Sequence, residues 1–366
     1  MQLAVIGLPK SGKTTVFNAL TRGNAEVAAY ASGSLEPNIG VVKVPDPRLD
    51  DLNGMFQPKK VTPADVTYVD IGGTGKAFGH GEGLGGPFLN YLTRCDALVH
   101  VVRAFRDERV PHPEGSVDPE RDIATMNLEL AFADLGLLEK RLQRIEIGLK
   151  GAKAHERGVF TSEQGLLARI KTLLEADIPA REQNLSEDEA RLIENYQFFT
   201  AKPLLILANV GEKELPDMPA LIERLRSTHA RPHVEVEGLC GKLEMELGQL
   251  SEEEAQEFRS DMGLGEPSLD RVIRASYGLL GLISFFTVGP DEVRAWTIRR
   301  DATAVKAAGK IHSDMERGFI RAEVVSFADL VRLGNMAEAR KHGALRAEGK
   351  TYEVKDGDIL TILFNV

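Results

Sequence analysis

Short apolar runs bounded by turn residues recur through the first half of the chain and again after residue 200. Such runs are typical of strands buried on both faces of a parallel sheet. They occupy residues 2–6, 41–44, 65–71, 97–102, 203–208 and the neighbourhood of 234–236. Several are followed by segments with helical periodicity, and a further helix is predicted near 252–262. The pattern therefore predicts an α/β domain.

Between residues 122 and 200 the period changes to one apolar residue every three or four positions. Charged residues fill the intervals, which is the pattern of amphipathic helices. The first arm and the candidate returning arm consist of Leu128, Phe132, Leu135, Leu138, Leu142, Ile145 and Leu149, then Leu166, Ile170, Leu173 and Leu174. We expect an antiparallel helical pair inserted in the α/β domain, although two ordinary packed helices would show the same pattern.

The pattern changes again from residue 282. Short strands at 284–287, 292–298, 319–324 and 358–364 surround a helical patch near 304–311, which indicates a small α+β domain. The predicted domains are residues 1–121 with 201–280 for the α/β domain, 122–200 for the helical insertion and 281–366 for the last.

Composition narrows the range of functions. A net charge of -10 argues against a protein that simply coats nucleic acid, although a local basic face could still bind RNA. Only Cys95 and Cys240 are present, so we expect a reducing compartment and no disulfide framework. No signal peptide and no long apolar run are evident, which predicts a cytoplasmic protein without a membrane span. Nothing demands a dimer, and a monomer is expected.

The first strand leads directly into a sequence that fits G-x-x-x-x-G-K-[ST], the phosphate-binding P-loop. The loop residues and the start of the following helix are Gly7, Leu8, Pro9, Lys10, Ser11, Gly12, Lys13, Thr14 and Thr15. The glycines let backbone N–H groups face a phosphate, Lys13 can reach the β and γ oxygens, and the Thr14 hydroxyl can ligate Mg²⁺. We predict nucleotide binding here.

Two later segments can complete such a site. Ser34 lies in the loop after the first helix, where GTPase-like proteins supply a second hydroxyl to Mg²⁺; the alternative is an ordinary surface loop. Asp70 ends a strand and is followed by Gly73, which gives D-x-x-G. Asp70 would hold Mg²⁺, directly or through water, and the Gly73 N–H would approach the γ-phosphate.

The strand at 203–208 ends in Asn209, Val210, Gly211 and Glu212, where GTPases carry N-K-x-D. Val210 replaces the lysine, and Glu212 is one methylene longer than the aspartate that accepts guanine's paired donors. That mismatch weakens a guanine-specific interpretation. Cys240 and Gly241 follow the next strand, where the last base-contacting loop is expected.

Taken together, these residues resemble the YchF/Obg-like ATPase family, within the translation-factor-related P-loop GTPases. Besides the P-loop, the likeness rests on segments 36–38, 44–49, 70–73, 81–85, 209–212, 293–297, 308–312, 318–322 and 354–358. The resemblance implies a coiled-coil insertion in the nucleotide domain and a C-terminal TGS domain with a β-grasp fold. It also implies ATP favoured over GTP, slow Mg²⁺-dependent hydrolysis and association with the ribosome, and it assigns His112 a part in hydrolysis.

The chain departs from the family pattern at several positions. Lys10 and Ser11 stand where the family has Asn-Val, Ser34 where it has Thr, and 72–74 read Gly-Gly-Thr where it has Ala-Gly-Leu. These differences suggest a divergent paralogue. Two alternatives stay open: a GTP-binding switch, and a nucleotide-binding adaptor for RNA or the ribosome that has lost hydrolysis.

Overall fold

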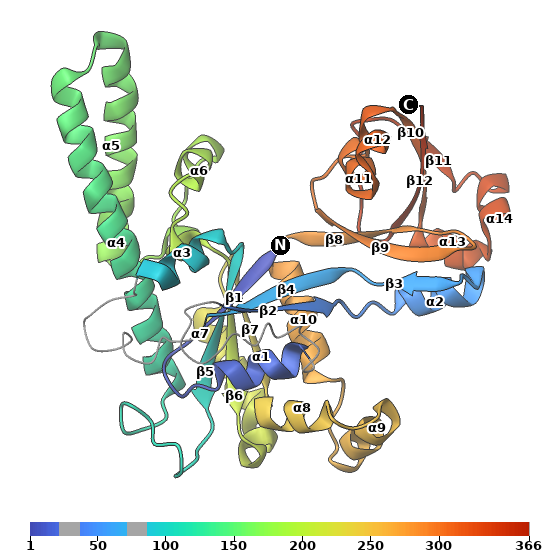
Figure 1. Ribbon diagram of the computed structural model, residues 1–366, viewed down its shortest axis with the longest axis horizontal. Helices are drawn as coiled ribbons and strands as arrows, with labels where there is room; N and C mark the ends of the chain where they lie inside the picture. Colours follow the sequence, from blue (N-terminus) through green and yellow to red (C-terminus); the bar gives the residue numbers. More distant parts are fainter. Residues whose placement is uncertain (22–36, 72–85, 366) are drawn as a thin grey trace. The chain divides into compact units, whose positions relative to one another are not determined.

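The computed structural model describes residues 1–21, 37–71 and 86–365 and divides them into two compact units. The first unit contains residues 1–40 and 67–272, and the second contains residues 41–66 and 273–366. Figure 1 traces the chain from the N-terminus in blue to the C-terminus in red. No helix in these described ranges is long and apolar enough to cross a membrane.

The first unit is built around a six-stranded sheet whose central strand is β1 (Gln2–Ile6). The order is β2 (Asn38–Lys43), β4 (Asp65–Asp70), β1, β5 (Ala97–Ala104), β6 (Leu204–Val210) and β7 (Val234–Leu239). From β4 to β7 the neighbouring strands are parallel. Their carboxyl ends therefore meet at one edge of the sheet, which is where ligands bind in open α/β folds. The predicted strands of the α/β domain are confirmed.

Helices from several parts of the chain accompany this sheet, and the last of them continues into the second unit. They are α1 (Lys13–Thr21), α3 (Gly86–Arg94), α7 (Met218–His229), α8 (Gly241–Leu247), α9 (Glu252–Asp261) and α10 (Ser268–Leu279). One core cluster joins apolar residues of α3, α7 and the helix that begins at Pro119 to the strands, including Leu92, Ile123 and Leu225. Short 3-10 turns at η2 (Ala180–Glu182), η3 (Phe199–Ala201) and η4 (Glu212–Asp217) connect the elements. The sequence pattern did not predict α7, α8 or α10.

Two long helices, α4 (Pro119–Gly151) and α5 (Ala154–Glu175), form a hairpin, followed by α6 (Glu187–Glu194) (Figure 1). Asp118 caps α4 by accepting a hydrogen bond from the Arg121 N–H, and Pro119 occupies the first turn, where no N–H partner is needed. The hairpin core contains Leu138, Ile145, Leu166, Leu167, Ile170 and Leu174.

The predicted apolar seam of the first arm was wrong in its N-terminal part. Leu128 and Phe132 are 44% and 64% exposed. The first half of α4 instead packs against the sheet through Ile123, Met126 and Leu130. Only its second half faces α5, so the buried stripe changes its angular position along the helix.

The second unit contains another six-stranded sheet. Its order is β11 (Arg346–Glu348), β10 (Phe319–Ser326), β12 (Asp358–Phe364), β8 (Leu282–Thr287), β9 (Glu292–Arg299) and β3 (Lys60–Thr62). Its helices are α2 (Arg48–Phe56), α11 (Ala304–Ile311), α12 (Ser313–Arg317), α13 (Phe327–Leu333) and α14 (Met336–Lys341). Three alanines of α11, namely Ala304, Ala307 and Ala308, pack on this sheet's core.

Residues 41–66 differ from the predicted division, which placed them in the nucleotide domain. β3 pairs in parallel with β9, with Lys60 opposite Glu292. Arg48 forms an ion pair of 2.8 Å with Asp356, which ties α2 to the turn before β12, and a local one of 2.8 Å with Asp46. The β3–β9 pairing and the Arg48–Asp356 ion pair join residues far apart in sequence, so no local pattern predicts them.

Candidate nucleotide-binding site

The P-loop connects the carboxyl end of β1 to the first turn of α1, in the order that the sequence predicts. Gly7 and Gly12 adopt φ angles of +152° and +90°, a region that favours glycine. A Cβ on Gly7 would lie 2.5 Å from the Val101 carbonyl oxygen, and one on Gly12 would lie 2.3 Å from Asn209 Nδ2. Both glycines are therefore required by conformation and by close contacts.

Lys13 begins α1, and its ammonium group folds back over the loop. Its Nζ donates to the carbonyl oxygens of Gly7 and Leu8 at 2.9 and 3.0 Å. Burial lowers the pKa of Lys13 to about 8, and the Asp70 carboxylate opposes this shift. The amine still carries its charge at neutral pH, and it lies at the loop where a phosphate would bind.

Thr14 and Asp70 bring two oxygen ligands together at the end of the sheet. Thr14 Oγ1 donates to Asp70 Oδ2 at 3.2 Å, and Asp70 is 2% exposed. Burial raises the pKa of Asp70, against the opposing effects of Thr14, Lys13 and Asn38. A hydroxyl and a carboxylate are the hard oxygen donors that suit Mg²⁺, so these two residues fit the predicted metal. The other predicted contributors, Ser34 and Gly73, lie outside the described residues.

Asn209 joins two loops of the site through both ends of its amide. Its Nδ2 donates to the Ser11 carbonyl oxygen at 3.0 Å, and its Oδ1 accepts from the Gly241 N–H, also at 3.0 Å. The residue is 4% exposed. Asn209 thus fixes the P-loop against the N-terminus of α8, and Gly241 takes part through its backbone.

Val210 and Cys240 are both 2% exposed and belong to one apolar cluster with Leu243 and Leu247. Burial raises the pKa of the Cys240 thiol, which makes it an uncharged core group. The sequence grouped both residues with the nucleotide contacts, and the structure places their side chains in the core beneath the loops.

Glu212 is the exposed acidic group of this region. Its carboxylate accepts a hydrogen bond of 2.8 Å from Lys242 Nζ, and its side chain is 47% exposed. The ion pair raises the pKa of Lys242. Lys242 was not singled out from the sequence, although its position one residue after Gly241 could have suggested it.

His112 lies in a buried polar cluster rather than on an open surface. Its Nδ1 accepts from the Glu114 N–H at 3.1 Å, so Nε2 carries the proton and donates to Asp122 Oδ2 at 2.9 Å. Asp122 also accepts from Arg121 at 2.7 Å. Both ring nitrogens of His112 are thus engaged in this arrangement.

Arg103 ties the segment before His112 to the P-loop. It is 2% exposed, and its guanidinium donates to the carbonyl oxygens of Val110 at 2.6 Å, Phe105 at 3.2 Å and Lys10 at 3.5 Å. Lys10 Nζ in turn donates to the Pro111 carbonyl oxygen at 3.2 Å. Sequence reasoning missed Arg103, whose only signal is a cation at the carboxyl end of a buried strand.

Two protein-family models match separate parts of the chain. The sequence family described as "50S ribosome-binding GTPase" matches residues 2–133, and the YchF GTPase C-terminal family, described as a protein of unknown function, matches residues 282–365.

Curated relatives named "Ribosome-binding ATPase YchF" are similar from end to end. The Bacillus subtilis protein is 44% identical over 365 residues, which cover 99% of this chain and 98% of that protein. The Escherichia coli O157:H7 protein is 42% identical over 362 residues, with the same coverage. A solved structure of the Schizosaccharomyces pombe YchF GTPase has a TM-score of 0.87 at 33% identity, covering 99% of this chain and 97% of that one.

Proposed function

The chain belongs to the YchF family, and from that premise we propose that it binds ATP in preference to GTP and hydrolyses it slowly with Mg²⁺. We propose further that it associates with the ribosome, as the names of its curated relatives state for them. The observation that carries the proposal is the P-loop, in which Lys13 lies within hydrogen-bonding distance of the loop carbonyls and the Thr14–Asp70 pair lies beside it.

The chain's own groups would contribute mainly by positioning. The backbone of the loop and the N-terminus of α1 would bind the phosphates, and Lys13 would move its donors from the carbonyls of Gly7 and Leu8 to phosphate oxygens. Thr14 and Asp70 would hold Mg²⁺, which would neutralise charge on the phosphates. Ser34 and Gly73 keep their predicted roles within this proposal.

Preference for adenine would come from Glu212. Its carboxylate already accepts from Lys242, so pairing both oxygens with guanine's two donors would compete with that ion pair. Adenine presents a single exocyclic amine there, and one carboxylate oxygen is enough to accept its hydrogen bond. Val210 and Cys240 would shape this part of the site from the core, and Asn209 would hold its two loops together.

Separate experiments test the proposed hydrolysis of ATP and the proposed association with the ribosome. Purified protein should release phosphate from ATP in the presence of Mg²⁺, and the release should stop when the metal is chelated. Protein that binds ATP without releasing phosphate would instead support the adaptor function. Co-sedimentation with ribosomes in the presence and absence of ATP tests the partner, and protein that stays in the supernatant in both would contradict the association.

Replacing Glu212 with aspartate is expected to shift the ratio of ATP to GTP affinity about tenfold toward GTP. The shorter carboxylate would lose its 2.8 Å bond to Lys242 and become free to accept paired donors. Calorimetric titration with both nucleotides measures the ratio. Glu253→Asp, the same change on the exposed first turn of α9, is the control, and an unchanged ratio in Glu212→Asp would remove the residue from base recognition.

Replacing His112 with alanine is expected to lower kcat for ATP about 100-fold and leave KM unchanged, because we propose that the ring assists hydrolysis. A catalytic role requires a free ring nitrogen, and we assign it to Nε2 released from Asp122, so Asp122→Asn, which keeps the ring and weakens its tether, should retain hydrolysis. Equal losses of activity in both variants, accompanied by a lower Tm, would show that the pair is only structural.

A further inference from the structure

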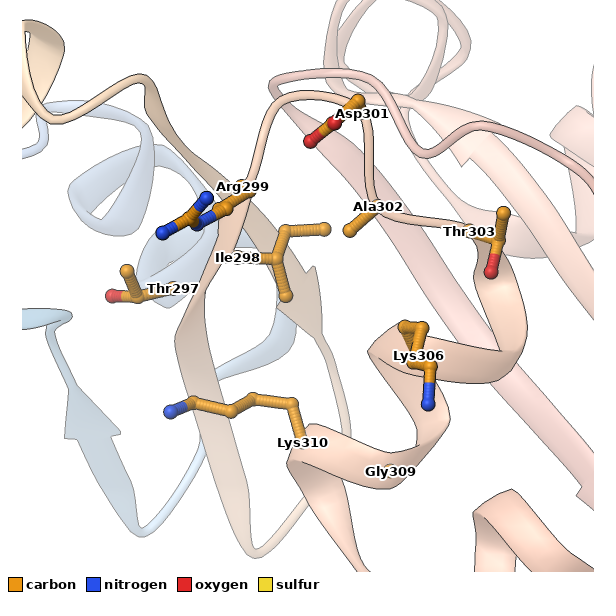
Figure 2. A pocket seen from close by; sticks show the side chains of 9 residues that line it. All are labelled: Thr297, Ile298, Arg299, Asp301, Ala302, Thr303, Lys306, Gly309 and Lys310. Carbon is orange, nitrogen blue, oxygen red and sulfur yellow. The ribbon is translucent and has the colours of Figure 1, made fainter. Parts of the chain in front are cut away.

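An open cleft of about 700 Å³ lies in the second unit, between the end of β9 and helix α11. Figure 2 shows Thr297 and Arg299 on the side of β9 toward which the Lys310 ammonium also extends. Asp301, Thr303 and Lys306 complete the polar lining, and Ile298 and Ala302 contribute apolar surface. No part of the proposed nucleotide site is involved.

The cleft borders an incompletely paired strand edge. β9 pairs along its length with β8, but β3 covers only residues 292–294 on the other side. Among the described residues, no strand pairs with the outer edge of 295–299. An unpaired edge presents N–H and C=O groups that can accept another strand.

The hydrogen-bond pattern shows which groups point outward. The Arg300 N–H donates to the Gly281 carbonyl oxygen at 3.0 Å, and residues of an antiparallel ladder alternate between bonded and non-bonded pairs. Thr297 and Arg299 therefore direct their backbone groups away from β8. The Arg299 carbonyl accepts from the Ala302 N–H at 3.0 Å. Within residues 1–21, 37–71 and 86–365, no backbone partner is recorded for the N–H and C=O of Thr297 or for the N–H of Arg299, so these groups are available to a partner.

The cleft is positively charged at this edge. Its lining carries three cationic side chains, those of Arg299, Lys306 and Lys310, and one carboxylate, that of Asp301. Lys306 is paired with Glu316 at 2.8 Å. Neither Arg299 nor Lys310 has an ion-pair partner within the part of the chain that the structure describes. Two free cations beside outward-pointing backbone groups suit an extended segment with acidic side chains.

We propose that this cleft binds an acidic peptide, which adds as a short strand to the open edge of β9 and continues the row begun by β3. Backbone hydrogen bonds to Thr297 and Arg299 supply the alignment. Acidic side chains on one face of the peptide pair with Arg299 and Lys310. Charge alone would also suit single-stranded nucleic acid, but an unpaired strand edge favours a peptide backbone.

The test uses the full chain and a fluorescein-labelled, end-capped octapeptide of alternating Glu and Val, followed by fluorescence anisotropy at low salt. Lys310→Glu should weaken binding about tenfold. The matched control is Arg321→Glu, which makes the same charge reversal on the exposed face of β10, outside the cleft, and should change affinity less than about twofold. Equal affinity of the Lys310→Glu and unmodified proteins would overturn the proposal.

A second peptide separates strand addition from simple charge attraction. Proline at the two central Val positions removes backbone donors and keeps every carboxylate, so it should weaken binding at least about tenfold. Amide hydrogen exchange at Thr297 and Arg299 should slow when the parent peptide binds. A proline peptide that binds as tightly as the parent, or an oligouridylate that binds more tightly than either, would contradict the proposal.

Discussion

Replacing Lys13 with alanine is expected to lower phosphate release from ATP about 1000-fold, the largest effect on activity that the structure suggests. The Lys13 ammonium is the charged donor at the P-loop, 2.9 Å from the Gly7 carbonyl oxygen. Lys10, the other cation of the loop, donates to the Pro111 carbonyl oxygen at 3.2 Å instead of to the carbonyls of the loop. A phosphate-release assay measures the loss, and calorimetry should show weaker ATP binding as well.

The same variant should be at least as stable as the unmodified protein. Burial lowers the pKa of Lys13 to about 8, so between that pH and the ordinary value of 10.5 the unfolded chain binds more protons than the folded one. The charged amine therefore reduces stability at neutral pH, and the cost falls as pH rises through this interval. Lys140→Ala, on an exposed position of α4, is the control. A Lys13→Ala protein with full activity would contradict the site.

Replacing Asp134 with alanine is expected to lower the free energy of unfolding by about 3 kcal/mol. This carboxylate of α4 is 0% exposed and accepts hydrogen bonds from the N–H of Phe199 and from the N–H and hydroxyl of Thr200, at 2.6 to 2.8 Å. Alanine would leave three buried donors without their acceptor. Urea denaturation measures the loss, and Asp188→Ala on exposed α6 should cost less than about 0.5 kcal/mol.

The contribution of Asp134 should also depend on pH. Burial raises its pKa to about 6, so the folded protein holds the proton to higher pH than the unfolded chain. Stability from this group is therefore greatest below the unfolded pKa and is lost as pH rises through about 6. The deficit of the alanine variant should be larger at pH 5 than at pH 8. A smaller deficit at pH 5 would contradict this assignment.

Local sequence was sufficient to predict the strand, P-loop and first helix, because each depends on neighbouring residues. The glycine positions, the lysine and the hydroxyl follow from backbone geometry and phosphate chemistry at fixed spacing. The short apolar runs likewise predicted the strands at Ala97–Ala104 and Leu204–Val210, which are buried on both faces.

Contacts between distant segments could not be predicted in this way. The sequence placed Asn209 among the nucleotide contacts but could not show that its amide joins Ser11 to Gly241, because that bridge exists only once β6 lies near the P-loop. Arg103 and Lys242 are ordinary cations in the sequence, and their partners are defined by the fold.

Contacts between distant segments also explain where the observed fold differs from the predicted one. The spacing of apolar residues predicted a single apolar face along α4. The N-terminal half of the helix packs on the sheet and the C-terminal half on α5, so Leu128 and Phe132 are exposed. Residues 41–66 follow the nucleotide-domain pattern in sequence, and their grouping with residues 273–366 depends on the Arg48–Asp356 pair and on β3.

Calorimetric titration of the purified protein with ATP and with GTP, each with Mg²⁺, tests the proposed function most directly. ATP is expected to bind at least tenfold more tightly, a difference of about 1.4 kcal/mol. Tighter binding of GTP would contradict the role given to Glu212 and favour a guanine-nucleotide switch. Binding of neither nucleotide would contradict the assignment of the P-loop itself.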